Sequence, residues 1–116
     1  MNVLVVDKDQ GSKTMLVSML TKRGHRAQSC ASSMEALQRV REARPDIILY
    51  DTKVDDLAIP DLIQQLSLKI TTQAIPIVAI SSHQDADEME RFLGLGCVEY
   101  FSKSGLNLIS LVDALP

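Results

Sequence analysis

The chain has 116 residues, a net charge of −3 at pH 7 and a hydrophobic fraction of 46%. A chain of this length normally forms one domain around one core, so we expect a single domain over residues 1–116. The acidic balance excludes a strongly basic nucleic-acid-binding protein, and the aliphatic content argues against disorder. Aromatic residues make up 3% and tryptophan is absent, which argues against a platform that stacks on bases or sugars.

Neither the cysteines nor the amino-terminal segment indicates export or a membrane. Cys30 and Cys97 are too few for a disulfide framework, and their spacing fits no zinc motif. Both lie in apolar stretches, so we interpret them as small buried hydrophobic residues. The apolar run in MNVLVVDKDQ is too short for a signal peptide or a membrane span. We therefore expect a cytoplasmic protein that does not enter a membrane.

In the first half of the chain, short aliphatic runs alternate with segments whose apolar residues are spaced three and four positions apart. The short runs are typical of buried strands, and the spaced segments are typical of amphipathic helices. Gly24 is a typical helix end, and Ser32 followed by Glu35 forms a capping box. We expect buried strands at 3–6 and 47–50, a weaker and more polar strand near a sheet edge at 25–30, and helices at 11–23 and 32–43.

The same alternation continues in the second half of the chain. Pro76 precedes an aliphatic run at a position where its missing N–H costs no ladder hydrogen bond. Asp85, Asp87 and Glu88 favour a helix start, and two glycines follow the apolar residues of that helix. We expect strands at 77–80 and 98–101, and helices at 62–70, 85–93 and 106–112.

Five strand–helix pairs predict an α/β fold with a parallel sheet covered by helices on both faces. The units are too few for a β/α barrel, which needs eight. We therefore expect an open (βα)5 doubly wound sheet of the flavodoxin-like kind, with strand order 2-1-3-4-5. Ligands of such sheets bind outside the carboxyl ends of the strands, between the first and third strands.

Four polar residues follow the ends of four predicted strands, namely Asp7, Asp51, Ser81 and Lys103. These residue types suit phosphoryl transfer to a carboxylate, with Asp51 as the nucleophile. A divalent cation would neutralise the incoming oxygens, while a lysine and a hydroxyl would bind them. One such residue alone would usually be a loop or cap residue, but the combination at four strand ends is more specific.

From Val3 to about Leu115 the chain resembles the receiver domain of bacterial response regulators. The resemblance lies in VLVVD at the first strand, PDIILYD at the third, IPIVAIS at the fourth and EYFSK at the fifth. It implies that Asp51 accepts a phosphoryl group and that Ser81 and Lys103 contact the phosphoryl oxygens. It also implies that Tyr100 couples to Ser81 during activation.

The resemblance further implies a Mg²⁺ site held by Asp7, Asp51 and the backbone carbonyl of Lys53. The implied function is a phospho-accepting receiver domain of a two-component or phosphorelay pathway, which switches when Asp51 is phosphorylated. Its donor would be a histidine kinase or a phosphotransfer protein, and its own chemistry would be limited to self-catalysed phosphotransfer and dephosphorylation. The last two helices and the last strand are the expected surface for a homodimer, and no direct nucleic-acid binding is expected.

Three positions depart from the family pattern: Lys8 replaces a second acidic residue, Val54-Asp55 replaces Met-Pro, and Lys103 is followed by Ser104 instead of proline. Without proline, we expect a trans peptide bond after Lys103. Lys8 changes the presumed pocket from a net charge of −2 to zero. We therefore hypothesise that the Lys8 ammonium reaches toward Asp51, partly replaces the metal and weakens Mg²⁺ binding; alternatively, Lys8 points into solvent.

Two other functions stay open. A pseudo-receiver would keep the fold as a protein–protein interaction module and signal without phosphorylation. An unrelated doubly wound protein, such as a flavin carrier or a small hydrolase, has less support, because the chain lacks a glycine-rich phosphate loop and a His or Cys nucleophile arrangement. His83, two residues beyond Ser81, is interpreted as a solvated loop residue, with an influence on dephosphorylation as the alternative.

Overall fold

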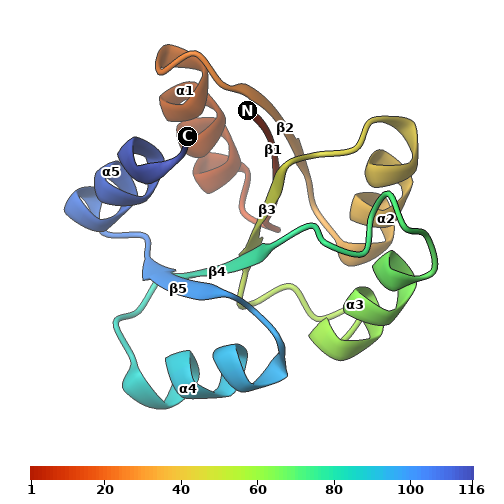
Figure 1. Cartoon of the computed structure of the whole chain (residues 1–116). Helices are drawn as coiled ribbons and strands as arrows, with labels where there is room; N and C mark the ends of the chain where they lie inside the picture. Colours follow the sequence, from red (N-terminus) through yellow and green to blue (C-terminus); the bar gives the residue numbers. More distant parts are fainter.

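The structure, a computed structural model, describes residues 1–104 and 107–116. Strands and helices alternate along it in the predicted order (Figure 1). The strands are β1 (Asn2–Val6), β2 (Arg26–Cys30), β3 (Ile47–Asp51), β4 (Ile77–Ser81) and β5 (Glu99–Ser102). The helices are α1 (Gln10–Lys22), α2 (Ser33–Glu42), α3 (Ile59–Ser67), α4 (Ala86–Leu95) and α5 (Gly105–Ala114).

The five strands form one parallel sheet in the order β2-β1-β3-β4-β5, which confirms the predicted doubly wound fold. In this register Val6 lies opposite Tyr50, and Asp51 lies opposite Ile80. The first residue after β1 and the last residue of β3 therefore leave the sheet side by side. This register brings two aspartates that are far apart in the sequence to one edge.

Helices cover both faces of the sheet, with α1 and α5 on one face and α2, α3 and α4 on the other (Figure 1). Successive strand residues point to opposite faces, so each buried strand supplies two cores. Leu4 and Ile48 belong to the core beneath α2 and α3, whereas Val5 and Leu49 belong to the core beneath α1 and α5. None of the helices in the described part of the chain is long and apolar enough to cross a membrane.

The third helix differs from its prediction, because it begins at Ile59 and ends at Ser67 instead of covering 62–70. Pro60 fits in the first turn, where its missing N–H is not needed. Beyond the helix, the Thr72 hydroxyl donates to the Leu66 carbonyl, so the chain turns away. Ile70, expected on the apolar face of the helix, is 86% exposed.

The smaller local predictions are confirmed. The Oγ of Ser32 accepts a hydrogen bond from the backbone N–H of Glu35 at 3.1 Å and caps α2. Cys30 and Cys97 are buried and free, and burial raises the pKa of each thiol to about 11. Among the described residues every peptide bond is trans, including the one that follows Lys103.

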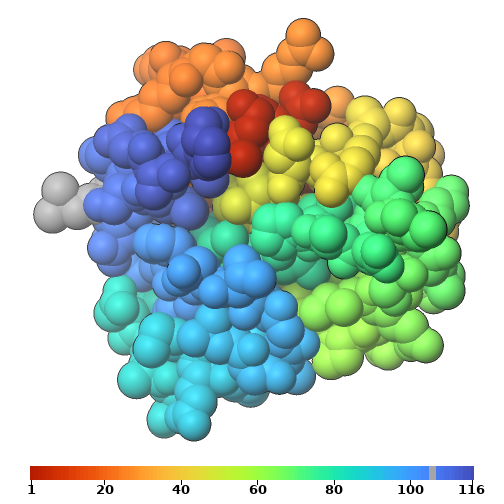
Figure 2. All heavy atoms as spheres, in the orientation of Figure 1, coloured from red at the N-terminus to blue at the C-terminus, as the bar shows by residue number. Residues whose placement is uncertain are grey.

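The two ends of the chain lie side by side on one face of the molecule (Figure 2). Arg23, just after α1, forms a 2.6 Å ion pair with Asp113 near the end of α5. The amino group of Met1 contacts Nδ1 of His25 at 3.1 Å. This face carries the amino-terminal ends of the strands, so the chain termini are remote from the edge where the predicted site lies.

Candidate functional site at the carboxyl ends of the strands

A cavity of about 330 Å³ opens at the carboxyl-terminal edge of the sheet. Parallel strands end along one edge, which is why residues that are distant in the sequence meet there. A larger cavity of about 440 Å³, beside the amino-terminal halves of β1 and β2, is lined by cationic and neutral residues and offers no carboxylate. The strand-end cavity is lined by Asp7, Lys8, Asp9, Ser12, Asp51, Lys53, Ser82 and Lys103.

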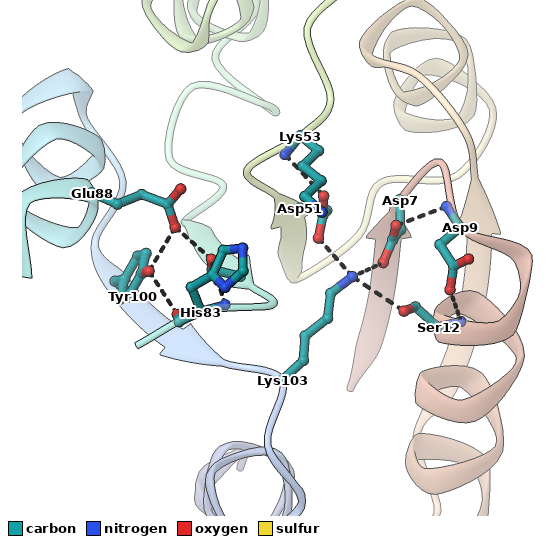
Figure 3. A network of polar contacts seen from close by, with 10 residues as sticks. Asp7, Asp9, Ser12, Asp51, Lys53, His83, Glu88, Tyr100 and Lys103 are labelled. Atoms are coloured by element: carbon teal, nitrogen blue, oxygen red, sulfur yellow. Dashed lines mark hydrogen bonds and ion pairs between the residues drawn. The ribbon is translucent and has the colours of Figure 1, made fainter. Parts of the chain in front are cut away.

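The ammonium group of Lys103 lies at the centre of this site (Figure 3). Its Nζ is 2.6 Å from Oδ2 of Asp7, 2.6 Å from Oδ2 of Asp51 and 3.2 Å from Oγ of Ser12. The side chains of the two aspartates are only 2% and 3% exposed. Burial alone would lower the pKa of Lys103, but the carboxylates of Asp51 and Asp7 hold it above its ordinary value. Lys103 is therefore a cation at neutral pH.

The two carboxylate oxygens of Asp51 have different environments. Oδ1 accepts a hydrogen bond from the backbone N–H of Lys53 at 2.9 Å, which fixes the carboxylate plane. Oδ2 is buried and accepts no hydrogen bond from the described residues, although the Lys103 ammonium lies 2.6 Å away. At that short distance the contact is a close ion pair, and a carboxylate oxygen with two lone pairs can take one further partner beside the ammonium. Oδ2 is therefore the oxygen with capacity for an incoming ligand.

The acidic segment after β1 is divided between the cavity and the helix that follows. Asp7 is buried, and its Oδ1 accepts the backbone N–H of Asp9 at 2.9 Å, which leaves Oδ2 directed at Lys103. Asp9 caps α1, because its Oδ2 accepts the backbone N–H of Ser12 at 2.8 Å. This hydrogen bond lowers the pKa of Asp9. Asp7 therefore serves the site, whereas the carboxylate of Asp9 is committed to the helix.

The hypothesis that Lys8 reaches toward Asp51 is wrong for this structure. The Lys8 ammonium lies 3.4 Å from Asp55 at the rim of the cavity, and the two side chains are 56% and 81% exposed. Burying this ammonium beside Asp51 would require its desolvation, and the position next to Asp51 is already taken by Lys103. The cation that pairs with the predicted nucleophile Asp51 is therefore Lys103, which follows β5, and not Lys8, which follows β1.

The hydroxyl of Ser81 also lies elsewhere than expected. Ser81 ends β4 and is 1% exposed, but the cavity is lined by its neighbour Ser82. The Oγ of Ser81 donates instead to Oε1 of Glu88 in the first turn of α4, and it accepts the backbone N–H of His83 at 3.1 Å. The hydroxyl of Ser81 is thus engaged outside the group formed by Lys103 and the two aspartates, although its carbonyl accepts the Lys103 N–H at 2.6 Å.

Glu88 is a site residue that the sequence pattern identified only as a favourable acid at a helix start. Its Oε1 also accepts the hydroxyl of Tyr100 at 2.6 Å, so one carboxylate oxygen joins Tyr100 to Ser81. Although burial disfavours the charged carboxylate, the two hydroxyl donors hold the pKa of Glu88 below its ordinary value. The backbone carbonyl of the exposed His83 lies 3.0 Å from the same Tyr100 hydroxyl and shares its single hydrogen with Glu88.

A second set of contacts, also not predicted, ties the loop after β3 to α2. The carboxylate of Asp56 accepts the backbone N–H groups of Ser33 at 2.9 Å and of Met34 at 3.0 Å. The hydroxyl of Tyr50 lies 2.5 Å from Oγ of Ser33 and contacts the carbonyl oxygens of residues 54 and 57 at 3.4 and 3.3 Å. The loop that carries Lys53 is therefore anchored on both sides.

The oxygen atoms that line the cavity are of the kind that binds magnesium, although the net charge of the cavity does not favour a cation. Mg²⁺ in proteins is commonly held by one or two carboxylates together with phosphate oxygens and waters. Asp7, Asp51 and Lys53 line the cavity, and Oδ2 of Asp51 has free capacity. However, three carboxylates and three ammonium groups line the cavity and cancel in charge. Among the described residues no cluster of three or more His, Cys, Asp or Glu forms a ready metal site.

Comparison with known proteins assigns the class to which this fold and site belong. The model of the response regulator receiver domain family matches residues 3–115. The chain therefore belongs to the response regulator receiver domain family, the regulatory domains of two-component signalling proteins. Its role is regulatory, and the expected fold and family are both confirmed.

Individual relatives are distant. Sporulation initiation phosphotransferase F of Bacillus subtilis (strain 168) is 24% identical over 101 residues, which cover 87% of this chain and 80% of the relative. The signal transduction histidine-protein kinase BarA of Escherichia coli (strain K12) is 27% identical over 106 residues, which cover 89% of this chain but only 11% of BarA. The chemotaxis response regulator CheY4 of Vibrio cholerae superposes with a TM-score of 0.81 at 18% identity, over 97% of this chain and 95% of CheY4.

Proposed function

We propose that this receiver domain accepts a phosphoryl group on Asp51 and changes state when it does so. The observation that supports this most directly is Oδ2 of Asp51, which is buried, has unused hydrogen-bonding capacity and faces the Lys103 ammonium. A phosphoryl group on Asp51 would add negative charge beside Lys103, and a lysine binds such charge as a point cation. The receiver fold and the carboxylate at the end of β3 therefore support the same function.

In the proposed step, Oδ2 of Asp51 attacks the phosphorus of a phosphohistidine on the donor. The new O–P bond forms as the P–N bond breaks, and the electron pair remains on the imidazole nitrogen, which takes up a proton. Attack of water on the phosphorus later returns inorganic phosphate and the carboxylate. Both steps are self-catalysed by the domain in this proposal, with Lys103 neutralising charge.

The same proposal includes a magnesium ion held by Asp7, Asp51 and the backbone carbonyl of Lys53. When bound, the ion would neutralise the phosphoryl oxygens during transfer. Lys103 and Lys8 both add positive charge near the acidic residues, so we expect Mg²⁺ to bind more weakly than in a pocket with a second acid at position 8. The residues therefore fit the ion but favour it only modestly.

The partners follow from the proposed chemistry and from the relatives. A histidine kinase or a phosphotransfer protein is the proposed donor, since relatives carry names of both kinds. We propose that residues 1–116 act as one receiver-like domain in the cytoplasm. The surface formed by α4, β5 and α5 is the proposed site of a homodimer, and direct nucleic-acid binding is not part of the proposed function.

A second candidate is a pseudo-receiver that binds partners without phosphorylation. The observation that favours it is the charge balance of the cavity, where Lys8 stands in place of an acid and Lys103 is already paired with both aspartates. A protein with this balance could keep the fold for its surface alone. The two candidates predict opposite results in a direct phosphorylation assay.

The deciding experiment incubates the purified domain with Mg²⁺ and acetyl phosphate and follows its intact mass. The phosphoacceptor proposal predicts a gain of one phosphoryl group in the wild type and no gain in Asp51→Asn. Beryllofluoride, a phosphoryl mimic, should in parallel shift amide resonances around the cavity in the wild type only. A folded wild-type domain that gains no mass and shows no shift would leave the interaction module as its function.

A further inference from the structure

The side chain of Glu88 is a shared acceptor for two hydroxyl groups near the strand-end cavity. Its Oε1 receives the hydroxyl hydrogens of Ser81, from the end of β4, and of Tyr100, from β5. Figure 3 shows Glu88, Tyr100 and His83 grouped on one side of Lys103, Asp7 on the other side, and Asp51 above the Lys103 ammonium. One residue of α4 thus connects the ends of two neighbouring strands.

A serine hydroxyl has one hydrogen to donate. While that hydrogen is held by Glu88, it cannot bind a phosphoryl oxygen on Asp51. A hydrogen bond to a carboxylate is about twice as strong as one between neutral groups. Ser81 is 1% exposed and Tyr100 is 8% exposed, so water competes weakly for either hydroxyl. A ligand that accepts the Ser81 hydrogen must therefore first break the hydrogen bond between Ser81 and Glu88, and this lowers the free energy gained on binding.

We propose that Glu88 is a positioning residue that holds the Ser81 hydroxyl away from the cavity, so that a phosphoryl group on Asp51 must compete with Glu88 for it. This inference rests on the proposed phosphoacceptor role of Asp51 and adds a means of regulation to it. When Ser81 turns to the phosphoryl group, Glu88 keeps only the hydroxyl of Tyr100 as a donor. The chemical state of Asp51 is thereby transmitted to α4 and β5.

Beryllofluoride affinity tests this competition in the whole domain. In Glu88→Gln the acceptor becomes neutral and weaker, so beryllofluoride should bind about 3- to 10-fold more tightly than to the wild type, as the release of one charge-assisted hydrogen bond permits. Glu90→Gln removes the same charge from an exposed position two residues along α4 and should leave the affinity unchanged. Glu88→Ala, which removes the acceptor entirely, should match or exceed Glu88→Gln.

The Ser81→Ala background tests whether the effect passes through Ser81. Without the hydroxyl, Glu88→Gln should change the beryllofluoride affinity less than 2-fold, whereas an undiminished increase would overturn the inference. Equal affinities of the wild type and Glu88→Gln would overturn it as well, while leaving Asp51 as the phosphoacceptor. Absence of beryllofluoride binding in all variants would overturn the proposed function and, with it, the competition.

The Tyr100 phenol supplies a readout that is independent of phosphorylation. Burial and the carboxylate of Glu88 raise the pKa of Tyr100. Glu88→Gln should therefore lower this pKa, measured by tyrosinate absorbance, with Tyr100→Phe identifying the signal against that of Tyr50. A Tyr100 pKa that does not respond to Glu88→Gln would show that the carboxylate does not hold the hydroxyl in solution and would overturn the inference.

Discussion

Lys103 and Asp51 form an ion pair that spans a strand. Asp51 ends β3 and Lys103 follows β5, and the two strands are separated by β4 in the sheet. The backbone of Lys103 is fixed as well, since its N–H donates to the Ser81 carbonyl at 2.6 Å. The order of the strands and this backbone hydrogen bond thus fix the Lys103 ammonium beside Asp51, the proposed phosphoacceptor.

Replacing Lys103 by Met should leave two buried carboxylates without their cation. Removal of one partner from a buried ion pair typically costs about 3–5 kcal/mol, so we expect the free energy of unfolding to fall by about 3 kcal/mol at pH 7. Urea unfolding measures this loss. Added Mg²⁺ should restore part of it, because Asp7 and Asp51 then need another cation. Lys53→Met, at an exposed side chain, is the control and should cost less than about 0.5 kcal/mol.

Replacing Lys8 by Asp should strengthen Mg²⁺ binding by about 10- to 100-fold, measured by titration followed with NMR. The substitution changes the charge at the cavity rim by two units, and each unit is worth about 1 kcal/mol against a divalent ion several ångströms away even in water. Lys22→Asp makes the same change at the far end of α1. A similar gain in that variant would show that net charge alone, not position 8, controls the affinity.

Replacing Asp56 by Ala should destabilise the domain at neutral pH by about 1 kcal/mol, a typical cost of losing a helix cap. Burial acts against the charged form, but the backbone N–H groups of Ser33 and Met34 hold the pKa of Asp56 below its ordinary value. The contribution is therefore present above the unfolded pKa and is lost as pH falls through the folded pKa. Wild type and variant should converge in stability once pH has fallen below the folded pKa of Asp56. Asp55→Ala, which loses only an exposed 3.4 Å ion pair, should be nearly neutral.

Two glycines at the end of α4 should respond oppositely to alanine. Gly96 has φ of +120°, and a Cβ there would lie 2.4 Å from the side chain of Ile63. Gly96→Ala should therefore cost about 1–3 kcal/mol. Gly94 is helical and its Cβ would meet open space, so Gly94→Ala should stabilise the domain by about 0.5–1 kcal/mol. Thermal unfolding of the two variants distinguishes the effects, and equal shifts would contradict the local geometry.

The domain should lose stability at alkaline pH. The buried thiols have pKa values raised by burial from 9.0 to about 11, so the folded state retains protons that the unfolded chain releases. Stability is then fully present below about pH 9 and falls as pH rises through 11, by about 2 kcal/mol for each cysteine at pH 10.5. The raised pKa values of Lys103 and of the two tyrosines act in the same direction. Urea unfolding from pH 8 to 10.5 measures the slope, and Cys97→Ala should reduce it.

The fold was predictable because three of its strands, β1, β3 and β4, are buried on both faces and therefore appear as continuous aliphatic runs. The same reasoning located Asp7, Asp51 and Lys103, since a residue that ends a parallel strand must lie at the ligand-binding edge. Ile70 was misplaced because its spacing fits the apolar face of α3, whereas a hydroxyl contact beyond the helix ends it three residues earlier. Tertiary contacts of this kind leave no periodic signal.

The partners chosen by each side chain were not predictable. Glu88 lies where many helices carry an acid, and nothing in the sequence distinguishes a capping charge from an acceptor for Ser81 and Tyr100. Charge alone predicts that Lys8 pairs with Asp51. Lys8 pairs with Asp55 instead, because burying its ammonium beside Asp51 would cost desolvation free energy. Residue types at strand ends therefore indicate where a site lies. They do not show which side chain hydrogen-bonds to which, because that depends on distances in the folded chain.

The anchoring of the loop after β3 has a mechanical consequence. Tyr50 and Asp56 fasten that loop to α2, so ligand binding near Lys53 orders little additional chain and has a small entropic cost there. The turn after β4 is held by side chains, because the Ser81 hydroxyl accepts the His83 N–H and the Tyr100 hydroxyl contacts the His83 carbonyl. A ligand that draws the Ser81 hydroxyl into the cavity should therefore loosen this turn, while the loop after β3 keeps its place.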